Sequence, residues 1–133
     1  MRVEAEFPHS RALPEMFGVL ARGSGDPAYR RSGTTTWIAG LGPEGPVTIR
    51  LRSRPDRVLA TFWGSAAEWA ADHLADLLGD GDDPRGFVPQ HPLIARQWRR
   101  YRQTLRVPRT LLTWQTALAT VLGEKFDMEL ATL

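Results

Sequence analysis

The sequence predicts an α+β fold in which two helices cover an antiparallel sheet. Several segments alternate between apolar and polar residues, which is the period of a half-buried strand. Tight turns join consecutive strands, so these strands run antiparallel. Two other segments space their apolar residues as amphipathic helices do. Further helices follow residue 90, and they lack obvious packing partners of their own.

The first strand and the first helix open the chain. Residues 2–7 place Val3, Ala5 and Phe7 on one face and charged residues on the other, which indicates a half-buried strand. The next segment has Pro14 near its start and Gly23 after its end, as a short helix does. Its apolar residues follow the helical spacing i, i+3, i+4, i+7, at Leu13, Met16, Phe17 and Leu20.

The middle of the chain predicts the rest of the sheet. Residues 28–31 form a short strand and residues 34–41 a longer one, which ends at the turn 42–45. Residues 47–52 alternate, the turn 53–56 follows, and residues 58–63 alternate again. The sheet therefore has one apolar face and one largely polar face.

The second helix covers the sheet over residues 65–78. Ser65 and Glu68 have the spacing of a capping box, and Gly79 ends the helix. Residues 80–89 are rich in Asp, Gly and Pro. They lack the ligand order of an EF-hand, so we interpret them as a connector.

Residues 90–133 are predicted to be the first helices of a truncated all-α domain, after an α+β domain at 1–89. His91 and Pro92 start one helix, and another begins near Leu112. Two amphipathic helices without a third layer leave an apolar face in water, which favours an incomplete domain. The alternative is that they pack on the second face of the sheet. The inner stripe of the first of these helices is Leu93, Ile94, Trp98 and Tyr101.

Charge is strongly segregated, although the net charge is only +2. Residues 64–84 contain acidic residues and no Lys or Arg, whereas residues 87–123 contain six arginines and no Asp or Glu. Clustered guanidinium groups with interleaved aromatic rings are typical of a phosphate-facing surface. The alternative is a solvated helix face, because Lys125 is the only lysine and arginine is this chain's general basic residue. The six arginines are Arg96, Arg99, Arg100, Arg102, Arg106 and Arg109.

Composition excludes several classes of function. The chain has no cysteine, no apolar run of membrane-spanning length and no signal peptide, so we expect a cytoplasmic monomer that does not bind a membrane. The three histidines lie far apart and show no metal-ligand spacing. No nucleophile–base pair and no phosphate-binding glycine pattern occurs. We therefore expect no metal, no cofactor and no catalytic residue.

Five segments resemble, in their order along the chain, bacterial DNA-3-methyladenine glycosylase II of the helix-hairpin-helix DNA glycosylase superfamily. The most specific are His91-Pro92-Leu93, then Val107-Pro108-Arg109-Thr110, then Val121-Leu122-Gly123-Glu124-Lys125. The others are Gly25-Asp26-Pro27-Ala28-Tyr29-Arg30 and Gly64-Ser65-Ala66-Ala67-Glu68-Trp69-Ala70. The resemblance covers nearly the whole chain.

The resemblance implies a fold and an activity. The family's N-terminal domain is an α+β unit similar to half of a TATA-binding protein, followed by helical parts that carry the catalytic Asp and the helix-hairpin-helix. The implied reaction is hydrolysis of the N-glycosidic bond of a flipped alkylpurine, in base-excision repair of double-stranded DNA with alkylated bases. Because the chain ends before the catalytic Asp, we expect the 133 residues alone to be inactive. The alternative is a non-catalytic basic α+β module that binds nucleic acid or a protein.

Six residues are candidate site residues. The resemblance places Lys125 at a turn whose residue wedges into the duplex, next to Glu124, where the family commonly has Gln. Lys125 also fits an exposed lysine in a helix–helix turn. Phe17 is the nearest match to an aromatic residue of the base pocket, although it fits the core stripe as well. Charge adds Arg99, Arg100 and Arg109 as candidate DNA contacts.

Overall fold

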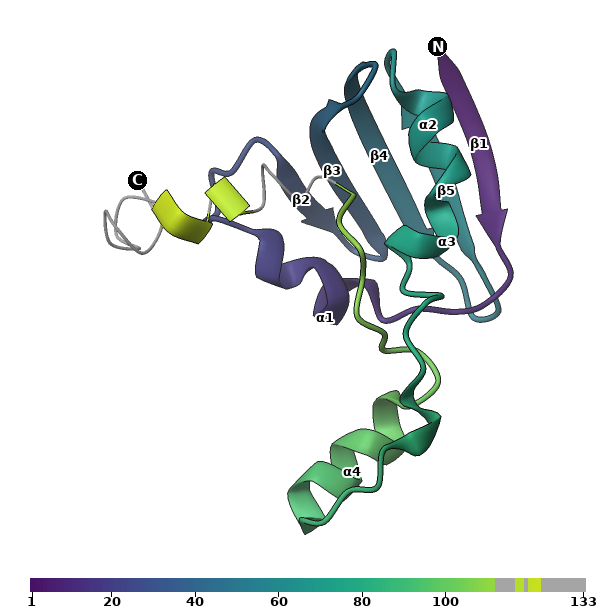
Figure 1. Cartoon of the computed structure of the whole chain (residues 1–133), viewed down its shortest axis with the longest axis vertical. Coiled ribbons are helices and arrows are strands. Elements are labelled where there is room, and N and C mark those ends of the chain that lie inside the picture. The colour runs from purple at the N-terminus through teal and green to yellow at the C-terminus, as the bar shows by residue number, and fades with distance from the viewer. Residues whose placement is uncertain (112–116, 119, 123–133) are drawn as a thin grey trace.

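A five-stranded antiparallel sheet forms the centre of the molecule, as the computed structural model shows for residues 1–111, 117–118 and 120–122 (Figure 1). The strands are β1 (Arg2–Phe7), β2 (Tyr29–Ser32), β3 (Thr35–Gly42), β4 (Gly45–Ser53) and β5 (Val58–Trp63). Their spatial order is β1-β5-β4-β3-β2, so β1 enters the sheet beside the last strand in the sequence. The predicted α+β fold with an antiparallel sheet is confirmed.

The helices of the sheet domain pack on one face of the sheet. They are α1 (Leu13–Phe17), the short 3₁₀ helix η1 (Gly18–Leu20), α2 (Ala67–Asp72) and α3 (Leu74–Leu77). α2 lies against β1 and β5, while α1 lies against β3 (Figure 1). A second 3₁₀ helix, η2 (Pro84–Gly86), precedes α4 (Pro92–Tyr101), which stands apart from the sheet.

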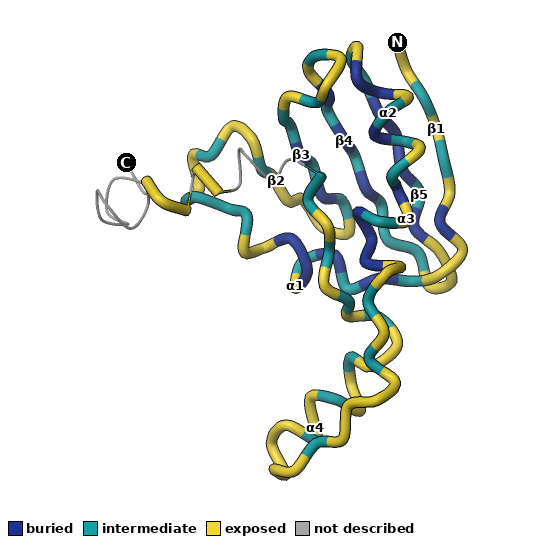
Figure 2. Tube along the Cα trace, viewed as in Figure 1, coloured by how far each residue is buried: buried dark blue, intermediate teal, exposed yellow. Residues whose placement is uncertain are grey.

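The core lies between the sheet and these helices (Figure 2). Alternation sends every second side chain of each strand to this face, which explains the buried positions Val47, Ile49 and Leu51 of β4. Phe62 and Phe17 are fully buried, from β5 and α1 respectively. Burial of each such side chain stabilises the fold by roughly 1.5–3 kcal/mol.

The turn after β5 requires glycine. Gly64 has φ +110°, a left-handed conformation that residues with a Cβ rarely adopt. A Cβ at this position would also collide with the Pro46 carbonyl oxygen. This close approach lets Ala66 N–H donate to the same carbonyl at 3.3 Å, which brings the start of α2 against the start of β4.

Two details of the helices differ from the sequence prediction. The capping box is wrong, because α2 starts at Ala67 after Ala66, and no side chain caps it. The single helix predicted over residues 65–78 is broken at His73. The His73 ring Nδ1–H donates to the Trp69 carbonyl at 2.7 Å. The His73 backbone N–H donates to the Ala70 carbonyl instead, which is one residue nearer in the sequence. The imidazole therefore competes for the carbonyl that a continuous helix would use.

Candidate nucleic-acid interface

The helix α4 and its C-cap residue Arg102 carry four of the six arginines in the basic stretch of the sequence. His91 caps its first turn, because its Nδ1 accepts from the Leu93 backbone N–H at 3.1 Å, and Pro92 occupies the first helical position. Arg99 and Arg100 lie in the last turn, where positive charge is favourable to the helix dipole. Local chemistry alone therefore accounts for both ends of this helix.

The arginines of α4 and of its C-cap are open to solvent. Arg96, Arg99, Arg100 and Arg102 are all exposed, and within the described part of the chain none forms an ion pair with a carboxylate. The Arg100 guanidinium lies 5.2 Å from the centroid of the Tyr101 ring, which supports it on one side. These groups are free to meet phosphate oxygens.

The predicted inner stripe of α4 does not pack on the sheet. Leu93 is 62% exposed and Ile94 is 48% exposed. Trp98 makes an edge contact with Phe87, with ring centroids 5.0 Å apart. A small apolar hollow of about 170 Å³ lies on this side of the helix. α4 thus presents an arginine-rich surface and a partly open apolar one.

The segment after α4 returns to the acidic connector. The Val107 N–H donates to the Asp82 carboxylate at 2.9 Å, and the Arg109 N–H donates to the Asp76 carbonyl at 3.2 Å. The two charge blocks that the sequence separates are therefore partly adjacent in space. Arg109 lies beside this acidic loop, whereas Arg99 and Arg100 belong to α4, which extends away from the sheet domain (Figure 1).

The remaining predicted site residues have different positions. Phe17 is fully buried in the core between α1 and the sheet, so its ring lines no open surface there. Lys125 and Glu124 lie outside the described residues.

A second arginine surface, which was not predicted from the sequence, lies on the sheet face opposite the core. Trp37 of β3 and Trp63 of β5 stack with ring centroids 5.7 Å apart and planes 17° from parallel. Arg50 of β4 lies 5.6 Å from the centroid of Trp37 and 5.3 Å from that of Trp63, and donates to the Thr61 hydroxyl at 3.2 Å. The sequence signal that could have revealed this surface is the alternation of the strands, which puts Trp37, Arg50 and Trp63 on the face opposite the core.

A large hollow lies at the end of the sheet beside the acidic connector. It has a volume of about 1040 Å³, and its walls mix opposite charges, including Arg11, Asp80 and Asp83. Burial and the nearby Arg106 lower the pKa of Arg11. The Arg11 Nε–H donates to the Leu78 carbonyl at 2.8 Å. This bond ties the chain before α1 to the end of α3, which is a structural role.

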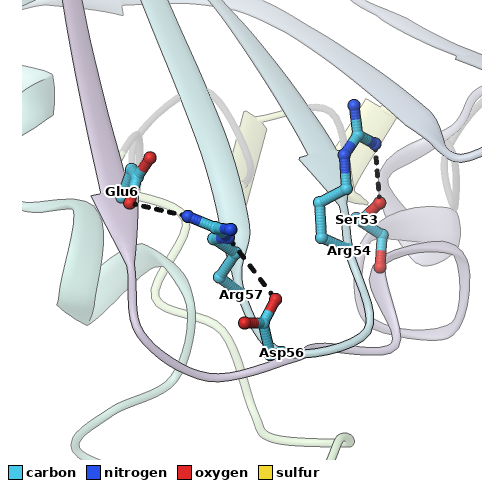
Figure 3. Close-up of polar contacts among 5 residues, drawn as sticks. All are labelled: Glu6, Ser53, Arg54, Asp56 and Arg57. Carbon is cyan, nitrogen blue, oxygen red and sulfur yellow. Dashed lines mark hydrogen bonds and ion pairs between the residues drawn. The ribbon is translucent and has the colours of Figure 1, made fainter.

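Ion pairs also fix the edge of this region. Arg57, in the β4–β5 turn, bridges Glu6 of β1 and the neighbouring Asp56, both at 3.4 Å (Figure 3). In the same turn, Arg54 donates to the Ser53 carbonyl at 3.0 Å. These arginines are engaged by the protein itself, in contrast to those of α4.

Comparisons with known proteins add no neighbour to this description. A scan against protein-family models found no match, and searches of curated proteins and of solved structures found none either. Among the described residues, no three His, Asp or Glu side chains gather in a way that would hold a metal ion. No described helix has both the length and the apolar character needed to cross a membrane.

Proposed function

We propose that the chain is the N-terminal portion of a DNA-3-methyladenine glycosylase, and that α4 contacts the phosphates of double-stranded DNA. In this proposal the α+β domain corresponds to the half of a TATA-binding protein that the family resemblance implies. The order strand, helix, four strands, helix supports it, as does an antiparallel sheet covered on one face.

The observation that carries the proposal is the placement of α4. It stands apart from the sheet, and its three exposed arginines and the exposed C-cap Arg102 have no carboxylate partner among the described residues. Guanidinium groups pair with phosphate in a fixed fork, and each neutralised phosphate releases counterions. A helix of this kind is well suited to follow a DNA backbone.

The apolar side of α4 fits the same proposal. Phe87, Leu93 and Ile94 are about half or more exposed, at 49%, 62% and 48%. Apolar residues gathered in this way mark a surface that another element covers. In the proposed enzyme, the helical part that carries the catalytic Asp would cover the apolar side of α4. The reaction in that helical part would replace the alkylated base on the sugar by water.

A non-catalytic basic module is the second candidate. The observation that favours it is that the helices α1, α2 and α3 and the sheet close their own core without α4. Such a domain would remain folded without an attached enzyme, and α4 would bind nucleic acid or a protein partner.

The salt dependence of duplex binding tests the role of α4. We expect binding of the 133-residue chain to a DNA duplex to weaken steeply with salt. The slope of log K against log salt should become less steep by about 0.9 for each phosphate that the variant no longer neutralises. The variant replaces four arginines by glutamine, at Arg96, Arg99, Arg100 and Arg102. The matched control replaces two ion-paired arginines, Arg57 and Arg85, and should keep most of the slope. A slope unchanged by the α4 variant would contradict the proposal.

Release of methylated bases separates the enzyme from the module. The 133-residue chain should release no base from alkylated DNA, whereas the product of the complete reading frame should release methylpurines. Activity of the isolated chain would contradict the assignment of catalysis to another part. No release by the complete product would leave the module as the function.

A further inference from the structure

The face of the sheet opposite the core is uncovered by any described helix. α1, α2 and α3 all pack with the buried side chains of the first face. On the opposite face, Trp37, Arg50 and Trp63 are partly exposed. We call these three residues, with the arginines around them, the open-face platform. A sheet face that carries two large aromatic rings and remains open calls for an explanation beyond folding.

The strand pairing fixes the geometry of this platform. Trp37 is paired directly with Arg50, and on its other side with Arg30 of the edge strand β2. Trp63 is paired with Arg2 and with Thr48. The rings therefore stand on neighbouring rows of one rigid sheet, with arginine close to each ring. Such a surface binds without first ordering a loop.

The charges of this face are not balanced within the protein. Its two carboxylates are already engaged, since Glu4 pairs with Arg2 at 2.7 Å and Glu6 pairs with Arg57 at 3.4 Å (Figure 3). Among the described residues, no carboxylate forms an ion pair with Arg30, Arg50 or Arg52. The Nε–H groups of Arg50 and Arg52 also lack a hydrogen-bond partner there. The face keeps surplus positive charge beside its aromatic rings.

A hollow lies beside Trp37 at the β2–β3 edge. Its volume is about 500 Å³, and its walls include Arg30, Ala39 and Thr48, which also point to the open face. Trp37 itself forms part of the same wall. A planar group entering this hollow would meet the indole ring and would have a guanidinium within reach.

We infer that the open-face platform binds single-stranded nucleic acid, with bases stacked on Trp37 and Trp63 and phosphates paired with arginine. Every base has a π-face, and stacking of a base on an aromatic side chain is tolerant of sequence. Arginine supplies both phosphate pairing and stacking. A duplex hides its base faces inside the stack, so a flat aromatic surface favours the single strand. This inference goes beyond the proposed function and does not depend on α4.

The test measures binding of the 133-residue chain to labelled dT12 and U12 by fluorescence anisotropy, with a 12-base-pair duplex for comparison. We expect saturable binding of a single strand, tighter than that of the duplex. Trp37→Leu should weaken it by roughly 5-fold to 150-fold, the range that loss of one stacked base implies. Trp37→Phe, which keeps an aromatic ring, should retain most of the affinity. It replaces Trp37→Leu as the test variant if the leucine variant fails to fold.

Matched variants locate the effect on the platform. Trp69 lies on α2, on the other side of the sheet, so Trp69→Leu should leave affinity for the single strand unchanged. Arg50→Gln should weaken binding, whereas Arg57→Gln should not. Thermal unfolding followed by circular dichroism confirms that each variant is folded.

Four outcomes would overturn the inference. The first two are absence of saturable binding to dT12 and U12 at low salt, and equal loss of affinity in the Trp37 and Trp69 variants. The third is tighter binding of the duplex than of the single strand, unaffected by Trp37→Leu. The fourth is an acidic dodecapeptide that binds as tightly as the single strand, with the same dependence on Trp37. The last result would assign the platform to an acidic protein segment. The α4 variant and the glycosylase assay do not report on this face, so failure here is distinct from failure of the proposed function.

Discussion

The sheet domain and α4 use their apolar side chains in opposite ways. In the sheet domain, strands and helices bury theirs in one shared core, where Leu51, Val58 and Phe62 have no exposed surface (Figure 2). In α4, Leu93 is mostly exposed and Ile94 about half exposed, and the helix is held mainly by its own turns and its cap. The stability of the described chain therefore resides in residues 1–78, and α4 contributes surface rather than core.

The arginines differ in the same way. Arg50 is fixed by a strand, two indole rings and a hydroxyl, whereas Arg96 and Arg99 are exposed on a helix surface. A fixed guanidinium beside aromatic rings suits a ligand of defined shape, such as a stacked base. Exposed guanidinium groups on a helix suit a repeating array of charge, such as a phosphate backbone. The two proposed binding surfaces therefore differ in the feature of a nucleic acid that each would recognise.

Truncation of one apolar side chain in each region gives the largest expected contrast. Phe62→Ala should lower the free energy of unfolding by about 3–5 kcal/mol, because it leaves a cavity in a closed core. Ile94→Ala should cost about 1 kcal/mol or less, because that side chain is already half exposed. Urea unfolding of both variants measures the two values. Equal losses would mean that α4 and the sheet share one cooperative core.

The sheet was predictable because its signals are local and repeat. Period-2 alternation located β1, β4 and β5 within one or two residues, and the tight turns at 42–45 and 53–56 indicated the antiparallel pairing of β3, β4 and β5. The break at His73 was not predictable, because it depends on an imidazole reaching a carbonyl that a regular helix would otherwise use. The capping box failed since Ser65 lies in the turn after Gly64, before the helix begins.

The candidate sites were predictable only in part. A run of arginines without acidic residues is visible in the sequence, and it correctly indicated that Arg96, Arg99 and Arg100 would be exposed. Trp37 and Trp63 lie 26 positions apart, on strands that are not neighbours in the sheet. Their stacking requires the register across β4, which turn lengths and tertiary packing determine. No single segment carries that information.

Loss of the α4 cap should have a smaller, local effect. His91→Ala removes the acceptor for the Leu93 N–H and should cost about 1 kcal/mol of helix stability. Amide exchange of Ala95, whose N–H donates to the His91 carbonyl at 2.8 Å, should then accelerate several-fold. His91→Asn should preserve protection, since its side chain also caps.

Amides of the sheet domain serve as the internal control for this variant. Their exchange should not change, because α4 is not part of their core. Faster exchange of Ile49 or Phe62 after His91→Ala would contradict the separation of the two regions.

The smallest expected effect concerns the connector between the two regions. Asp83 accepts two hydrogen bonds from the Arg85 guanidinium and a third from the Arg85 backbone N–H, which together lower the pKa of Asp83 from 3.8 to about 2. A lowered folded-state pKa means that this interaction is complete above pH 3.8 and disappears as the pH falls through about 2. Both side chains are exposed, so the change in global stability should be slight.

Carboxyl carbon shifts in an NMR titration report the Asp83 pKa directly. Arg85→Gln should raise that pKa only part of the way to 3.8, because the backbone N–H remains, while Arg57→Gln should leave it unchanged. A titration of Asp83 near 3.8 in the unaltered chain would show that the connector is not held by this local pair.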